Sequence, residues 1–167
     1  VAVDLGTGAT RTLARWPDGQ TPYVWASAVS ACGTMAAFGW NNGTVVVVRG
    51  LDAALGGGDA DTHTIGCGSS VRSVSFSACG EHIAVGAEDG RVVVHSARTG
   101  AQEHVVAEGC DGNKTMAAYT PDGDIFFASA PRPAAGQSLR RARPPQGPGR
   151  LPRRPWTGPA RRGAPTA

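Results

Sequence analysis

The chain has 167 residues, 41% of them hydrophobic, and a formal net charge of +3. This length is enough for one domain with a hydrophobic core. Val, Ala and Gly dominate and aromatic residues make up 6%, a balance that favours strands and tight turns over helices. No apolar run is long enough to span a membrane and no charged-then-apolar leader is present, so we expect an intracellular protein, cytoplasmic or nuclear, with no membrane partner. Because the first residue is Val rather than Met, we also expect a fragment of a longer protein.

The first 16 residues predict a strand "VAVDL", a turn "GTG" and a second strand "ATRTLARW". Taken alone, this stretch resembles the phosphate hairpin of the actin, heat-shock-70 and sugar-kinase ATPases. That resemblance implies ATP binding by Asp4, Gly6, Thr7, Gly8, Thr10 and Arg11. The sequence that follows has short Val-rich strands at a fixed period instead of the alternating strands and helices of those ATPases. We therefore favour a strand and turn that resemble the hairpin but bind no phosphate.

An internal repeat organises the chain from here to residue 130. The turn "SACG" occurs at 30–33 and 77–80, and the turns "NNG" and "EDG" end at Gly43 and Gly90, so both pairs are shifted by 47 residues. A third copy begins at residue 114, where Gly123 lies 43 residues after Gly80. Such a period is typical of stacked supersecondary units.

Each unit predicts four short strands. In the second unit these are residues 71–77, 82–87, 91–97 and 102–107, joined by Gly-containing turns, and they form an antiparallel meander. Both faces of such a sheet carry large apolar side chains, each contributing roughly 1.5–3 kcal/mol when fully buried. Radial stacking of successive sheets covers both faces and produces a propeller.

These features resemble the WD40 repeat family over about residues 1–130. The period, the turn "AEDG", the first strand "VRSVSFS" and the Thr99-Gly100 pair fit the family pattern. The family's Gly-His pair is replaced by Gly19-Gln20, Gly66-Cys67 and Gly109-Cys110. Asp89 matches the family's turn Asp and Asn42 is a polar substitute, but without the His the polar network that the resemblance implies is incomplete. We therefore expect divergent blades that are held together mainly by apolar stacking.

The predicted fold class is all-β, a partial WD40-like β-propeller with about two full four-stranded blades and two partial ones. We place the propeller segment at 1–130, with blades at 1–16 (partial), 17–68, 69–107 and 109–130 (partial). A propeller closes with four to eight blades, so we expect further blades from a longer chain or from another chain.

Residues 131–167 predict a separate, disordered tail. They carry nine Arg and nine Pro and no acidic residue, whereas all 13 acidic residues of the chain precede them. Three interpretations stand: nucleic-acid binding through phosphate contacts, Pro-x-x-Pro recognition by a partner domain, or translation of non-coding GC-rich DNA. The abrupt end of the last blade favours the third.

We expect no catalytic, cofactor-binding or metal-binding residues. The cysteines form no Cys-x-x-Cys pair, which indicates small buried or turn-lining thiols: Cys32, Cys67, Cys79 and Cys110. None of the histidines His63, His82, His95 and His104 forms a metal or protease motif. Three of them lie on or beside predicted strands, where we expect surface positions: His63, His95 and His104. Asp59 and Asp61 lie in a Gly-rich insertion and indicate a solvated loop.

The resemblance implies a non-catalytic scaffold that binds other proteins through rim loops. The loops before the first strands and between the second and third strands share one rim. The partner-binding residues predicted on this rim are Trp40, Asn41, Asn42, Glu88 and Asp89. Trp40 is the predicted hot spot, because an exposed aromatic beside a turn favours binding; the alternative is that Trp40 packs against the next blade.

Overall fold

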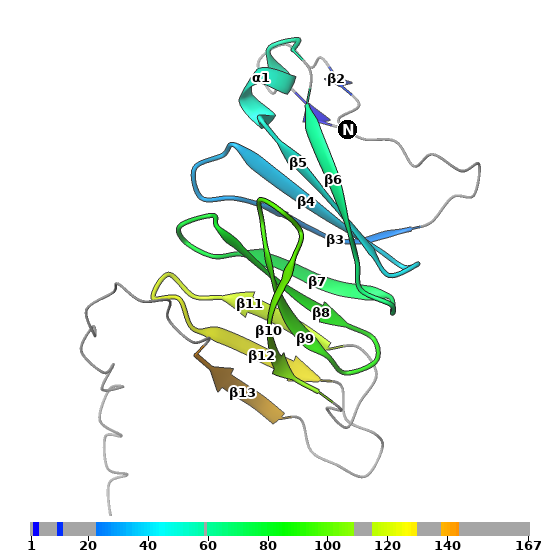
Figure 1. Cartoon of the computed structure of the whole chain (residues 1–167), viewed down its shortest axis with the longest axis vertical. Coiled ribbons are helices and arrows are strands. Elements are labelled where there is room, and N and C mark those ends of the chain that lie inside the picture. The colour runs from blue at the N-terminus through cyan, green and yellow to red at the C-terminus, as the bar shows by residue number, and fades with distance from the viewer. Residues whose placement is uncertain are drawn as a thin grey trace, which may run out of the picture.

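The computed structural model describes Ala2–Val3, Thr10–Arg11 and residues 23–58, 60–108, 115–129 and 138–143. Three antiparallel sheets are stacked one on the next along the long axis of the molecule (Figure 1). A separate short hairpin pairs β1 (Ala2–Val3) with β2 (Thr10–Arg11). The all-β class and the partial propeller predicted from the sequence are confirmed.

The first and second sheets are four-stranded meanders. The first contains β3 (Val24–Val29), β4 (Met35–Trp40), β5 (Thr44–Arg49) and β6 (Asp61–Gly66). The second contains β7 (Val71–Phe76), β8 (His82–Ala87), β9 (Val92–Ser96) and β10 (Gln102–Ala107). All four strands predicted for the second unit are therefore present, within a residue or two at each end.

The turns between these strands use glycine where the backbone needs a positive φ. Gly33 and Gly80 have φ values of 73° and 75° in the first turns of the two sheets, and Gly43 and Gly90 have values of 85° and 88° in the second turns. Side chains with a Cβ rarely adopt this conformation. The repeated glycines therefore give the two sheets the same hairpins.

Each interface between sheets is an apolar layer. Between the first and second sheets, Ala37, Val45 and Val47 pack with Val74 and Phe76. On the other face of the second sheet, a separate cluster contains Ala84, Val92, Val94, Ala117, Ile125 and Phe127. Alternate residues of β8 thus face opposite neighbours, as expected for a sheet buried on both sides.

The third sheet contains β11 (Thr115–Tyr119), β12 (Ile125–Ser129) and β13 (Ser138–Ala142). The sequence predicted only two strands here and a disordered tail from residue 131. That prediction is wrong for Ser138–Ala142, which pairs antiparallel along the whole of β12. The strand forms without β-branched residues because β12 supplies the hydrogen bonds and Asp124 binds Arg141 and the following Arg143.

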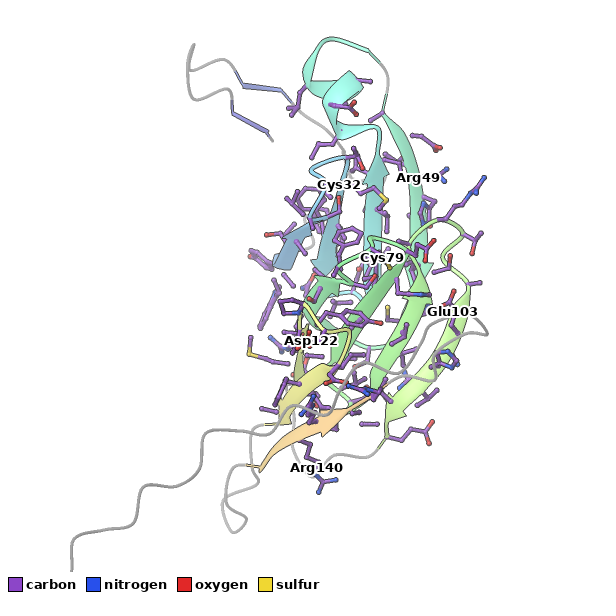
Figure 2. All side chains as sticks on the ribbon, turned by 90° about the vertical axis from the view of Figure 1, so that its left-hand side faces the viewer. Cys32, Arg49, Cys79, Glu103, Asp122 and Arg140 are labelled. Carbon is purple, nitrogen blue, oxygen red and sulfur yellow. The ribbon has the colours of Figure 1, made fainter. Side chains whose placement is uncertain are left out.

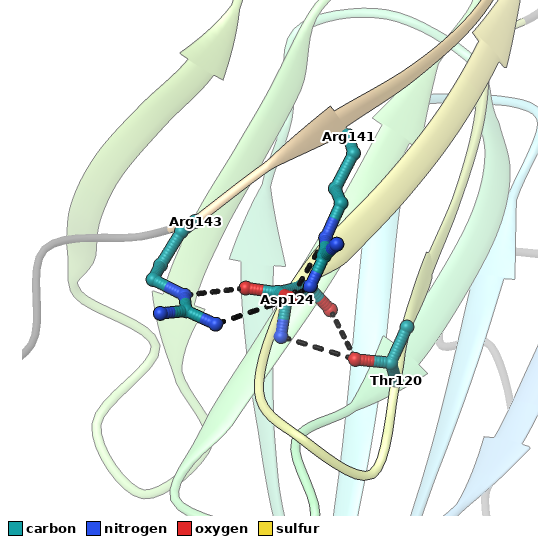
Figure 3. A network of polar contacts seen from close by, with 4 residues as sticks. All are labelled: Thr120, Asp124, Arg141 and Arg143. Atoms are coloured by element: carbon teal, nitrogen blue, oxygen red, sulfur yellow. Dashed lines mark hydrogen bonds and ion pairs between the residues drawn. The ribbon is translucent and has the colours of Figure 1, made fainter. Parts of the chain in front are cut away.

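Asp124 is the buried anchor of this last strand (Figure 3). Only 1% of its surface is exposed. Arg143 Nε lies 2.6 Å from its Oδ1, and Arg141 Nε donates to its Oδ2 at 2.8 Å. The hydrogen bonds from Arg143 and then Arg141 lower the pKa of the Asp124 carboxyl, although burial opposes them. Two arginines of the predicted tail therefore bind the third sheet, Arg141 within β13 and Arg143 just after it.

A short helix lies in the connection between β5 and β6. Helix α1 (Leu51–Leu55) follows β5 and buries Leu51 and Ala54; the sequence, whose composition favoured strands and turns over helices, did not predict it. Within the described residues, no helix has the length and apolar character that a membrane crossing requires.

Candidate functional site

The first strands of the first two sheets each contain a β-bulge at the same position of the repeat. In the first sheet Val24 faces Trp40 and Ala26 faces Gly39, so Trp25 is the extra residue. In the second sheet Val71 faces Ala87 and Ser73 faces Gly86, so Arg72 is the extra residue. Bulges bend a strand and redirect a side chain, and these two residues are 47 apart in the sequence.

The two bulge residues contact each other across the sheet interface. The guanidinium carbon of Arg72 lies 3.4 Å from the centroid of the Trp25 ring. Arg72 Nη2 lies 2.7 Å from the Glu88 carboxylate, and the Arg72 side chain is only 8% exposed. A cation over a Trp face is worth about 0.5–2 kcal/mol, more when it is desolvated. Trp25 remains 50% exposed, so the contact fixes its ring while leaving part of it open to solvent.

Hydrogen bonds hold the surrounding rim loops. The Asn41 side-chain oxygen accepts from Tyr23 N at 2.9 Å, and the Asn41 carbonyl accepts from Ser70 Oγ at 2.5 Å. The Ser70 carbonyl in turn accepts from Glu88 N at 2.8 Å. These bonds connect the start of β3, the β4–β5 turn, the loop before β7 and the β8–β9 turn. The rim is therefore braced by backbone as well as side-chain contacts.

We call Tyr23, Trp25, Trp40, Asn42 and Asp89 the rim surface. Tyr23 is 70% exposed, Asn42 and Asp89 are exposed, and Trp40 is half-buried at the end of β4. Its loops lie at one end of the first two sheets, as the hydrogen bonds above require.

The five residues predicted from the sequence therefore differ in role. Asn41 and Glu88 are bound to other parts of the rim, through Tyr23 and Arg72 respectively. Asn42 Oδ1 accepts from Thr44 N at 3.2 Å and Asp89 Oδ1 from Arg91 N at 3.1 Å, so each closes its own turn. Whether any of them binds a partner stays a prediction.

Sequence reasoning missed Tyr23, Trp25 and Arg72. The available signal was the spacing of 47 residues between Trp25 and Arg72, which makes them equivalent positions in adjacent repeats. The bulges that turn them toward each other have no separate mark in the sequence. Tyr23 precedes β3 and its exposure follows from the fold.

One expectation about the histidines is wrong. His95, expected at the surface, is 5% exposed on β9, because the sheet is covered there on both faces. Burial lowers its pKa, and its Nδ1 lies 3.2 Å from the Gly100 carbonyl oxygen. His63 on β6 also has both ring nitrogens buried, and burial followed by the charge of Arg49 lowers its pKa.

The cysteines in the described residues are free thiols. Cys32 and Cys79 are exposed in the first turns of their sheets, and Cys67 is half-buried. Hydrogen bonds from Ser30 and Thr34 lower the pKa of the Cys32 thiol to about 7, whereas burial raises that of Cys67 to about 11. Cys110 lies outside the described residues.

Only some of the remaining candidate residues lie in the described part of the chain. Asp61, expected in a solvated loop, is instead the first residue of β6 and pairs with Arg49 on β5; Asp59 lies outside the described residues. Of the residues named for a phosphate hairpin, Thr10 and Arg11 lie in β2, and the others lie outside the described residues: Asp4, Gly6, Thr7 and Gly8.

No protein-family model and no curated protein sequence matches this chain. Solved structures do match it, among them the crystal structure of the RRP9 WD40 repeats and the structure of U3-55K. In each case the TM-score is 0.55 at 12% sequence identity, and the match covers 66% of this chain. The chain spans 34% of the length of each structure. The stacked sheets thus have the fold of WD40-type propeller blades.

Proposed function

We propose that this chain is a non-catalytic protein-interaction scaffold that binds a partner protein through the rim surface. The observation that carries this proposal is the Trp25–Arg72 contact, which fixes a half-exposed indole beside the exposed Tyr23. Trp, Tyr and Arg are the residue types that most often supply binding hot spots.

The bracing of the rim supports this role energetically. A partner that binds a mobile side chain must order it, at about 0.5–1.5 kcal/mol for each side chain. Arg72 is already held between Trp25 and Glu88, and the loops around it are hydrogen-bonded to one another. Most of that ordering cost is therefore met when the chain folds.

The polar groups of the rim support a non-catalytic role. Asn41, Asn42 and Asp89 accept hydrogen bonds from backbone amides, and the Glu88 carboxylate pairs with Arg72. Their acceptor atoms are engaged in holding turns, so they supply rigidity rather than proton transfer. Asn42 and Asp89 remain exposed and add a polar border to the aromatic centre.

The experiment has two stages. A photo-crosslinking residue at Tyr23 identifies the protein that contacts the rim, with the same residue at Thr62 on β6 as the control position. The purified partner is then titrated calorimetrically against the wild type, Trp25→Ala, Trp25→Phe and Thr62→Ala. We expect Trp25→Ala to weaken binding by at least about 30-fold, the loss that a 2 kcal/mol hot spot produces, and Trp25→Phe to lose less because it keeps a ring.

Equal affinity of the wild type and Trp25→Ala, with both folded by circular dichroism, contradicts the proposal. So does a partner that crosslinks equally from Tyr23 and Thr62. Either result moves the binding surface away from the rim.

A further inference from the structure

A second cluster of reactive side chains lies in the turn between β7 and β8, away from the bulges. It contains a thiol, a carboxylate and an imidazole, from Cys79, Glu81 and His82. One potential ligand atom from each residue lies within 4.8 Å of the other two. Cys79 and Glu81 are exposed and His82 is half-exposed, so a solvated ion can reach all three.

The backbone of this turn is closed in a way that brings the three side chains together. Ser77 N donates to the His82 carbonyl at 2.9 Å, and Gly80 N donates to the Ser77 carbonyl at 2.9 Å. The Ser77 hydroxyl also accepts from His82 N at 3.1 Å. Gly80 adopts a φ of 75°, which reverses the chain between Cys79 and Glu81. The cluster is therefore built on a fixed hairpin.

A fourth side chain reaches the cluster from the outer strand of the same sheet. Glu103 on β10 places its Oε2 2.6 Å from His82 Nδ1. Cys79, in the β7–β8 turn, and Glu103, on β10, belong to the same sheet (Figure 2). Metal-bound histidines almost always have their ring supported by a carboxylate or carbonyl of this kind.

We propose that Cys79, Glu81 and His82 form a binding site for a divalent transition-metal cation of the Zn²⁺ class, with Glu103 supporting the imidazole. Thiolate and imidazole ligands select Zn²⁺ and its neighbours over Mg²⁺ and Ca²⁺, which prefer oxygen ligands. Three protein ligands leave a coordination position for water or for a group from a partner. The cation also offsets the negative charges of Glu81 in the turn and of Glu103 on the neighbouring part of β10.

The chain contains a natural comparison in its first sheet. The turn from Ser30 to Met35 has the same backbone, with Ser30 N donating to the Met35 carbonyl at 2.9 Å and Gly33 N to the Ser30 carbonyl at 2.9 Å. It also has an exposed thiol, Cys32, that contacts Thr34 Oγ1 at 2.9 Å. Thr34 and Met35 stand where the second turn has Glu81 and His82. Cys32 is therefore equivalent to Cys79, but its turn has neither the carboxylate nor the imidazole that stand beside Cys79.

The test is a titration of the reduced 167-residue chain with Co²⁺, followed by Zn²⁺. Cobalt bound to a thiolate in a tetrahedral site gives charge-transfer and visible absorption bands. We expect these bands in the wild type, saturating at one equivalent and disappearing when Zn²⁺ is added. Cys79→Ser should abolish the charge-transfer band, whereas Cys32→Ser should keep it.

Two further variants separate a metal site from an isolated reactive thiol. His82→Gln should weaken Co²⁺ binding by at least 10-fold because it removes a ligand, and Glu103→Gln by about 10- to 100-fold because it removes the support of the imidazole. Circular dichroism of each variant shows that it is folded.

Three results overturn the proposal: no thiolate band in the wild type, a band that depends on Cys32 instead of Cys79, or binding unchanged in His82→Gln. In each case the His82–Glu103 pair is only a surface ion pair, which contributes little. None of these results bears on the rim surface, so the two proposals fail independently.

Discussion

Trp25 and Arg72 show how a repeat places chemistry at the level of single residues. Equivalent positions of adjacent repeats become neighbours when the sheets stack, and here one position carries an indole and the other a guanidinium. The contact at 3.4 Å depends on both bulges, because each strand must turn its extra residue out of the usual alternation. Different residues at equivalent positions of a repeat are therefore worth pairing before a structure is known.

His63 is a half-buried titratable group whose charge should destabilise the fold. Both ring nitrogens are buried and have no hydrogen-bond partner among the described residues, and its neighbour in the next sheet is the turn at Gly100. Burial, followed by the nearby Arg49, lowers its pKa, while Asp61 partly opposes them. The unfolded chain therefore binds the proton more readily than the folded chain.

Stability should consequently fall as the pH drops below about 6.5, the ordinary pKa of histidine. We expect His63→Leu to stabilise the chain by about 1 kcal/mol at neutral pH, because it removes unpaired buried nitrogens, and to reduce the loss on acidification. Urea unfolding at pH 7.5 and 5.5 measures both effects. Thr62→Leu, on the opposite face of β6, is the control. The same pH dependence in His63→Leu as in the wild type would contradict this explanation.

At the level of elements, β13 is the strand that depends most on a single buried charge. Asp124 is 1% exposed and pairs with Arg141 and Arg143, which are 41% and 52% exposed. Burial of a carboxylate is unfavourable unless such partners are present. The strand and its anchor therefore stabilise each other.

We expect Asp124→Asn to weaken β13 by about 2 kcal/mol, since it replaces charge-assisted hydrogen bonds with neutral ones. Limited trypsin digestion measures this, because cleavage after Arg140 and Arg141 requires the strand to open. Cleavage should be faster in Asp124→Asn than in the wild type and unchanged in Asp122→Asn, which alters an exposed carboxylate of the same turn. Equal rates in the two variants would mean that β12 alone holds the strand. Because the folded carboxyl has a lowered pKa, its contribution should be lost as the pH falls through that lowered value.

At the level of the whole molecule, the middle sheet differs from its two neighbours. Its faces are covered by the first and third sheets. The first sheet exposes Val29, and the third exposes Met116 and Phe126, at 60%, 61% and 36% respectively. Residues beside these in sequence, such as Ala28, Ala117 and Phe127, pack inward against the second sheet, so the exposed ones face outward. These are the surfaces where the predicted further blades would pack.

The close approach of the sheets depends on glycines at equivalent positions of the two repeats. A Cβ at Gly39 would clash with the Val71 side chain, and a Cβ at Gly86 would clash with the Thr115 carbonyl oxygen and the Ser73 hydroxyl. Between the second and third sheets, Ala117 N also donates to Ser73 Oγ at 2.7 Å. The stack therefore has little room for a side chain at this depth.

We expect Gly86→Ala to destabilise the chain by about 3 kcal/mol, since the added methyl must displace backbone of the third sheet. Gly66→Ala is the matched control, because nothing lies within 4 Å of a Cβ built there, and its effect should stay within about 0.5 kcal/mol. Urea unfolding of both variants makes the comparison. Similar midpoints for the two would show that the second and third sheets do not pack as described.

Much of the fold was predictable because it depends on local rules. Alternating and continuous Val-rich runs specify strands, glycines specify the turns, and the period of 47 residues specifies that the sheets are copies. Apolar residues on both faces of the second unit then require a sheet on each side. The predicted strands β7 to β10 match the structure for this reason.

The tertiary structure decided what depends on partners distant in sequence. Strand β13 has few strand-forming residues and exists through its pairing with β12 and through Asp124. His95 became buried because a neighbouring sheet covers β9, and Trp25 met Arg72 because two bulges turned them together. Sequence alone determined the repeating sheet, since its signals lie within a few residues. Only the folded chain determined the sites, because each is assembled from separate strands or turns.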